Sequence, residues 1–334
     1  DLRFTEPRFM GRDLAAGFDI YSLRTDFLDQ SSFENQSTGI GLRLSFPVSE
    51  RTSLGLTYTL VQDDTQVADI LVDNDGDPLT PGVDQCDASN PTRSFICDQE
   101  GTFLTSVIGT TINVDRRNQP VRATRGFDLQ LSQDIAGLGG EVNYLRTEIE
   151  GGIYYGLPFG FRASFRGNAG YIAGWGGDDV RINDRFFKGG SSFRGFDVAG
   201  IGPRQMIINN TTGAIEQVGD SIGGNAFAIG TLQLDVPLPL PESFSLGSAL
   251  FVDFGTLGVV DSASRQTVVI ERDINNVPIR SLIVDDTPSL RAAAGVSIFW
   301  DSPFGPVQFD FAQPLQYEDY DRREQFRFST RTQF

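Results

Sequence analysis

The sequence predicts an all-β fold, specifically a transmembrane antiparallel β-barrel, and three features of the chain indicate it. Apolar and polar residues alternate with a period of two along most of the 334 residues, whereas amphipathic helical periodicity is almost absent. The polar face of successive strands carries charged residues, glycine and serine, as the side facing a water-filled lumen does. Short turns and long loops alternate between the strands, which is typical of the two rims of such a barrel.

The alternation is clearest in four segments. In residues 39–46 the apolar side chains share one face, while Arg43 lies on the other with small residues. Residues 53–60, 127–132 and 307–312 repeat this pattern. A soluble antiparallel sheet with one face on a core would show the same period. The polar character of the second face and the alternating connections favour the membrane barrel.

About thirteen strands are predicted, and most are long enough to cross a bilayer when tilted. They lie near residues 2–9, 14–26, 36–46, 52–65, 102–115, 123–134, 141–155, 160–173, 224–236, 243–257, 288–300, 305–313 and 324–334. Short turns are expected near 10–13, 47–50, 157–160, 237–242 and 301–305, and long irregular loops near 66–101, 175–223, 259–287 and 315–323. Bacterial single-chain barrels have an even number of strands, because lipid offers no partner to an open sheet edge. We therefore expect further strands before Asp1.

Composition argues against several classes of function. The chain has 44 acidic and 27 basic residues, a formal net charge of −17, which disfavours a nucleic-acid-binding surface. It has no histidine, the commonest general base and metal ligand. No nucleophile–base pair, phosphate loop or metal cluster is recognisable, so we expect no enzyme activity and no cofactor. No segment approaches the eighteen or so apolar residues of a membrane helix.

Two cysteines lie close together in the first long loop. We expect a disulfide between Cys86 and Cys97, as in proteins of an oxidising compartment, with free thiols as the alternative. Closing so short a segment would stabilise the fold by about 2–3 kcal/mol. Its expected role is to staple the loop locally.

The same loop contains alternating aspartates. Asp73, Asp75 and Asp77 have a spacing that can hold Ca²⁺. Pro78 stands where a calcium loop needs glycine, and the twelfth position is not glutamate. We expect a solvated acidic loop, with a calcium site as the alternative.

A motif in the loop between 175 and 223 identifies a family resemblance. Phe193-Arg194-Gly195-Phe196, followed by Ile201-Gly202-Pro203-Arg204, resembles the "VRGF…IGP" loop motif of the BamA family. Segments 223–239, 251–258 and 300–315 are similar to the family segments that follow this loop. The chain ends in Phe334, as an outer-membrane sorting signal would. The resemblance is strongest over 185–334 and weaker, though in order, over 1–175.

The resemblance implies a sixteen-stranded barrel of the BamA type. Residues 1–334 would form its barrel domain from the fourth to the sixteenth strand, with the first three strands and the periplasmic POTRA domains outside this sequence. Residues 175–223 would be the long loop that folds into the lumen.

The resemblance also implies a role for Arg194, which would pair with acidic residues on the inner wall. Asp253 is the expected partner, because it shares the inward face of its strand with Gly247 and Phe251. A guanidinium can pair bidentately with a carboxylate, and a partly enclosed lumen screens the pair less than an open surface.

Other positions fit this site to different degrees. Gln233 stands where the family tends to have glutamate, and Asp235 on the same face is a possible substitute. Gly195 would permit a tight turn, and Phe193 and Phe196 would wedge the loop. Without the resemblance, the same residues would suit a glycine-rich surface loop with a solvated arginine.

The resemblance implies a function without covalent chemistry. An integral barrel of the bacterial outer membrane would fold unfolded outer-membrane protein clients into the bilayer, with outer-membrane lipids and accessory Bam lipoprotein subunits as partners. A labile seam would form at the last strand, with residues Gln325, Phe326, Arg327, Phe328 and Phe334. The alternatives are a secretion pore of the two-partner or TamA type, a passive diffusion porin and a soluble β-sandwich adhesin.

Overall fold

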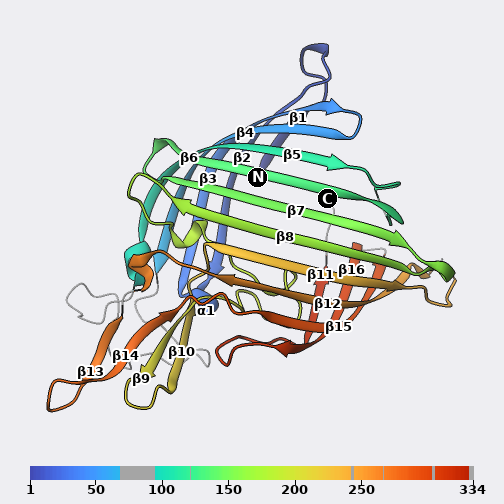
Figure 1. The fold of residues 1–334 in the computed structure, drawn as a ribbon. Coiled ribbons are helices and arrows are strands. Elements are labelled where there is room, and N and C mark those ends of the chain that lie inside the picture. Colours follow the sequence, from blue (N-terminus) through green and yellow to red (C-terminus); the bar gives the residue numbers. More distant parts are fainter. Residues whose placement is uncertain (68–94, 121, 242–243, 266, 303–304, 331–334) are drawn as a thin grey trace.

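The computed structural model describes residues 1–67, 95–120, 122–241, 244–265, 267–302 and 305–330, and its main feature is one curved antiparallel sheet of 13 strands (Figure 1). The strands are β1 (Leu2–Glu6), β2 (Ala15–Phe27), β3 (Phe33–Ser49), β4 (Thr52–Val67), β5 (Gly101–Asp115), β6 (Arg125–Gly140), β7 (Tyr144–Gly156), β8 (Arg162–Gly174), β11 (Ala226–Val236), β12 (Leu246–Gly258), β15 (Arg291–Ser302), β16 (Gly305–Gln316) and β17 (Phe326–Thr330). Each strand pairs with the next in this order. The predicted all-β fold and its strands are confirmed.

Two long connections are more regular than the sequence suggests. Segments 175–223 and 259–287, predicted to be irregular, contribute to a second, four-stranded sheet of order β10-β9-β14-β13. Its strands are β9 (Arg204–Asn209), β10 (Ile215–Ser221), β13 (Val268–Arg272) and β14 (Pro278–Asp285). They were missed because they are short and pair only with one another. In Figure 1 this small sheet projects away from the large one.

In the part of the chain that the structure describes, helical structure is confined to short segments. These are η1 (Phe9–Gly11), α1 (Leu28–Ser31), η2 (Phe95–Gln99), η3 (Pro158–Gly160), η4 (Ile182–Asp184) and η6 (Ser262–Arg265). Among the described residues, no helix has the length and apolar character needed to cross a membrane. In η1 and η3 the positive φ angles of Gly11 and Gly160 allow the chain to reverse between neighbouring strands.

The two faces of the large sheet differ as the alternation predicts. Leu42, Phe326 and Phe328 expose about half of their side-chain surface on the outer, convex face. On the opposite face Arg43 forms an ion pair with Asp19, with 2.7 Å between Nε and Oδ2. Many other large apolar side chains of these strands are exposed as well. A continuous exposed apolar surface of this kind is typical of a face that contacts a membrane or another protein.

The buried core lies on the inner face, where segment 175–223 packs against the strands. Phe186 of this segment meets Phe227 of β11 edge to face, with 4.6 Å between ring centroids. A Cβ atom on Gly170 of β8 would lie only 2.4 Å from the Phe227 ring, so glycine makes room for this packing. The core therefore packs the loop against the inner face of the large sheet, unlike the core of a β-sandwich, which lies between two sheets.

The large sheet has two edges, β1 and β17. β17 pairs with β16 from Val307↔Thr330 to Phe311↔Phe326. Phe328 contacts Phe309, and Phe326 contacts Phe311, with centroid separations of 5.3 and 5.1 Å. Within the described residues, the outer edge of β17 has no partner strand.

Candidate functional site

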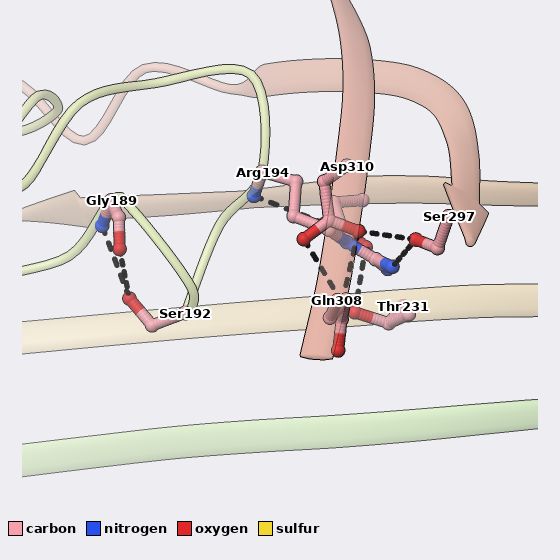
Figure 2. Close-up of polar contacts among 8 residues, drawn as sticks. Gly189, Ser192, Arg194, Thr231, Ser297, Gln308 and Asp310 are labelled. Atoms are coloured by element: carbon pink, nitrogen blue, oxygen red, sulfur yellow. Dashed lines mark hydrogen bonds and ion pairs between the residues drawn. The ribbon is translucent and has the colours of Figure 1, made fainter. Parts of the chain in front are cut away.

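A tight turn presents the arginine of the loop motif. The Ser192 hydroxyl donates to the Gly189 carbonyl at 2.8 Å and accepts from the Gly189 amide at 3.1 Å, as Figure 2 shows. Gly195 has φ +93°, and a Cβ atom there would lie 2.7 Å from Cβ of Ala293 on β15. Glycine is therefore required at position 195, both for its backbone conformation and for the close approach to the wall.

Arg194 is held by Asp253 of β12. Its Nε donates to Asp253 Oδ2 and its Nη2 to Oδ1, both at 2.8 Å, and its backbone amide donates to Oδ2 at 3.1 Å. Arg194 is 8% exposed and Asp253 is 2% exposed. The structure thus brings together the two residues that sequence analysis paired. A fork of two parallel hydrogen bonds fixes the geometry and strengthens the pair.

The pair continues into a network that spans four strands (Figure 2). Thr231 of β11 donates to Asp253 Oδ1 at 2.8 Å. Arg194 Nη1 donates to the hydroxyl of Ser297 on β15 at 3.1 Å, and that hydroxyl donates to Asp310 of β16. Sequence analysis did not predict Thr231, Ser297 or Asp310 as partners. The alternation in residues 307–312 does place Asp310 on the inward face of its strand.

Aromatic rings surround the pair. The Arg194 guanidinium lies 3.4 Å from the ring centroid of Phe251, a cation–π contact. Phe193 and Phe196 are fully buried and meet edge to face at 5.2 Å. Water is largely excluded, so removal of either charged partner would leave an uncompensated buried charge, at a cost of about 3–5 kcal/mol.

Two other predicted partners, Gln233 and Asp235, do not contact Arg194. Asp235 accepts instead from Arg162 Nε at 2.6 Å, and Gln233 donates to Asp235 at 2.7 Å. Asp235 is too far from Arg194 to contact it. It lies four residues along β11 from Thr231, which is about 13 Å at the rise of a strand, and Thr231 is the residue of β11 that reaches the Arg194–Asp253 pair. The second contact of the guanidinium is Ser297.

The loop also contacts the chain just before β17. The Glu324 amide donates to the Gly195 carbonyl at 3.1 Å. Arg327 of β17 donates to Glu324 at 2.8 Å and forms a longer ion pair with Asp197 at 3.4 Å. The motif loop and the predicted seam strand are therefore physically connected.

The remaining predicted seam residues lie in different places. The Gln325 carbonyl accepts from the amide of Ala312 at 2.9 Å, which extends the pairing with β16 by one residue. Phe326 and Phe328 face outward. Phe334 lies outside the described residues.

Two carboxyl groups with raised pKa values lie elsewhere in the loop. Asp220 of β10 accepts from the hydroxyl of Ser32 at 2.9 Å, and burial raises the pKa of Asp220 to about 7. Burial, reinforced by the charge of Asp63, raises the pKa of Asp184 in η4 to about 7. Both carboxyl groups are therefore easier to bury when protonated.

The first long loop can be described only in part. Cys97 is buried in η2 and is disulfide-bonded, while its predicted partner Cys86 lies outside the described residues, so the pairing stays a prediction. Asp73, Asp75 and Asp77 also lie outside the described residues. In the part of the chain that is described, no cluster of three or more His, Cys, Asp or Glu residues could hold a metal. The arrangement at Arg194 can anchor a loop.

Comparison with known proteins gives consistent relatives. The chain is 26% identical over 316 residues to outer membrane protein assembly factor BamA of Neorickettsia risticii, covering 94% of this chain and 36% of that protein. It is 25% identical over 354 residues to BamA of Neisseria meningitidis serogroup B, covering 100% of this chain and 41% of that protein. The chain thus spans about two fifths of the length of these relatives.

A solved structure shares the fold. The crystal structure of BamA from Haemophilus ducreyi lacking POTRA domains 1–3 matches with a TM-score of 0.72 and 21% identity, covering 98% of this chain and 60% of that one. The resemblance to the BamA family is therefore confirmed. The model of the Omp85 superfamily domain matches residues 1–334, so this chain belongs to the Omp85 superfamily.

Proposed function

We propose that this chain is the barrel portion of an outer-membrane protein assembly factor. It would reside in the outer membrane and help unfolded β-barrel clients fold into the bilayer. Support comes from the relatives named as assembly factors and from the exposed apolar face of the wall. Accessory lipoprotein subunits and outer-membrane lipids are the other proposed partners, and no covalent chemistry is required.

The observation that carries this proposal is the docking of Arg194 across β11, β12, β15 and β16. A buried ion pair of this kind costs desolvation and gives little net stability, so its value lies in fixing one loop position. The loop also reaches Arg327 on the last strand. Docking can therefore control how firmly β17 is held.

Two physical routes would let β17 assist a client. Within the described residues the outer edge of β17 has no partner strand, and a labile pairing at this edge would let a client strand add by β-augmentation. A short apolar wall near that edge would also thin the bilayer locally and lower the barrier to insertion. Both routes need only strand pairing and hydrophobic mismatch.

The test uses the full-length protein with its accessory subunits in lipid vesicles. Arg194→Ala and Asp253→Ala should each slow assembly of a model client, because each leaves a buried charge unpaired and releases the loop. Arg162→Ala is the matched control, since Arg162 pairs with Asp235 on the inner wall without contacting the loop. Assembly is followed by the heat-dependent gel mobility of the client.

Normal assembly rates in both loop variants would contradict the proposed role of the loop. A secretion pore would instead move a polypeptide across the vesicle membrane without inserting it. A diffusion porin would conduct ions equally well with and without Arg194. Measuring insertion, translocation and conductance on the same vesicles therefore separates the three functions.

A further inference from the structure

A groove of about 930 Å³ crosses the outer face of β6, β7, β8, β11 and β12. Its floor is a row of three glycines that are direct cross-strand neighbours, Gly151, Gly167 and Gly230. Leu129 ends the row on β6 and Phe254 ends it on β12. Because glycine has no side chain, the wall is recessed over Gly151 and Gly167, whereas the rings of Phe254 and Phe165 cover Gly230.

The sides of the groove are apolar. Ile149 and Ile153 of β7 flank Gly151 and are among the exposed residues of the wall. Phe165 and Phe254 stack at 6.5 Å above Gly230. The volume falls in the range of small-ligand sites, about 300–1,000 Å³. The groove is open along its length, which suits a flexible apolar chain lying against the wall.

One end of the groove carries a positive charge. Arg125 begins β6 after the short connection from β5, and it faces Tyr155 of β7 in register. Both side chains are exposed. Within the described residues the Arg125 side chain has no ion pair or hydrogen bond. Short turns of outer-membrane barrels face the periplasm, and exposed tyrosines mark the lipid headgroup level.

We propose that this groove binds a phospholipid of the periplasmic leaflet. One acyl chain lies over Gly151 and Gly167 and ends against the rings of Phe165 and Phe254, and the phosphate pairs with Arg125. The charge at headgroup depth favours a lipid over the apolar wall of a second protein, because a guanidinium and a phosphate are complementary. This inference rests on the proposed location of the wall in the outer membrane.

Gly167 offers a selective way to fill the groove. A Cβ atom there would contact only the Phe165 ring, at 3.8 Å, which is an ordinary packing distance. Gly167→Leu should therefore fold while occupying the floor. Thr110→Leu on β5 is the matched control, because Thr110 lies between the outward residues Ile108 and Ile112 and outside the groove. Arg125→Gln removes the charge and leaves the floor open.

The measurement is native mass spectrometry of the full-length protein in detergent, titrated with diacyl phosphatidylethanolamine. Diacylglycerol with the same chains and inorganic phosphate form two further arms. We expect saturable phospholipid binding that weakens about tenfold or more in Gly167→Leu and in Arg125→Gln and is unchanged in Thr110→Leu. Diacylglycerol should bind more weakly and be insensitive to Arg125→Gln, and phosphate alone should not bind.

Phospholipid binding that is equal in the wild type and Gly167→Leu would overturn the inference. Binding of phosphate alone that is as tight as binding of the phospholipid would also overturn it, because the acyl chain would then contribute nothing. Client assembly is measured separately on the same variants. Retained lipid binding in Arg194→Ala, with assembly lost, separates a failure of the groove from a failure of the proposed function.

Discussion

At the scale of single residues, Arg194 makes three hydrogen bonds to one carboxylate, that of Asp253. Two guanidinium nitrogens and the backbone amide all donate to Asp253, and a third nitrogen reaches Ser297. A lysine would keep the charge but could not form the fork or stack flat on Phe251. The site therefore selects arginine by shape as well as by charge.

Arg194→Lys should weaken loop docking by about 1.5–3 kcal/mol, the worth of a hydrogen bond to a charged group. The expected readout is faster hydrogen exchange at the amides of Arg194 and Asp197. Arg162→Lys is the control, because its partner Asp235 does not contact the loop. Unchanged exchange in Arg194→Lys would mean that charge alone holds the loop.

Asp220 gives a pH dependence whose sign can be worked out. Its pKa is about 7 in the folded loop, above the ordinary value of 3.8, so the folded state binds the proton more tightly than the unfolded state. Stability of the loop should rise as pH falls from about 7 to about 4, and should be lowest above pH 7.

The measurement is protease cleavage within segment 204–221, with a protease active at both ends of this pH range. Cleavage should be slower at the lower pH. Asp220→Asn keeps a group of the same shape without a titrating proton, so its cleavage should depend less on pH. A steeper pH dependence in Asp220→Asn would contradict the assignment.

At the scale of elements, β17 is held to β16 by aromatic pairs on the outer face. Phe326 and Phe311, and Phe328 and Phe309, lie directly opposite each other. Such cross-strand pairs contribute roughly 0.2–1 kcal/mol each. Within the described residues β17 has five residues and lies at an edge of the sheet, so these contacts are a large share of what fixes it.

A double-mutant cycle on Phe311→Ala and Phe326→Ala should give a coupling energy within that range. Urea unfolding in lipid vesicles provides the free energies. A cycle on Phe165→Ala and Phe326→Ala is the control, because Phe165 lies on β8, far along the sheet from β17. No coupling in the first cycle would mean that backbone pairing alone fixes β17.

The strands of the large sheet could be read from the sequence, since period-two alternation survives along each one. The strand boundaries were predicted less well, since β17 begins at Phe326 and the predicted strand began at residue 324. Asp253 could be paired with Arg194 because parity and the family motif both indicated it. Ser297 was not predicted, since its contact depends on the register between β15 and β16 and on the depth to which the loop descends.

At the scale of the whole molecule, the outer face and the core are separate surfaces. The apolar outer face is exposed, and the buried core is formed by the loop and the inner face. The full-length protein should therefore require detergent for extraction and should migrate faster on a gel before heating than after. Because Arg194 takes no part in the strand pairing of the wall, Arg194→Ala should keep this shift, and its loss would show that the docked loop is needed for the wall to form.

Asp310 stands between two arginines. It accepts the Ser297 hydroxyl that also contacts Arg194, and across the strand pair it lies opposite Arg327. If the final strand peeled off, the loop would lose the ion pair between Asp197 and Arg327, while Arg194 would stay bound to Asp253 and Ser297. Detachment of the last strand would therefore loosen the loop without freeing it, because the anchor of Arg194 on β12 and β15 does not include β17.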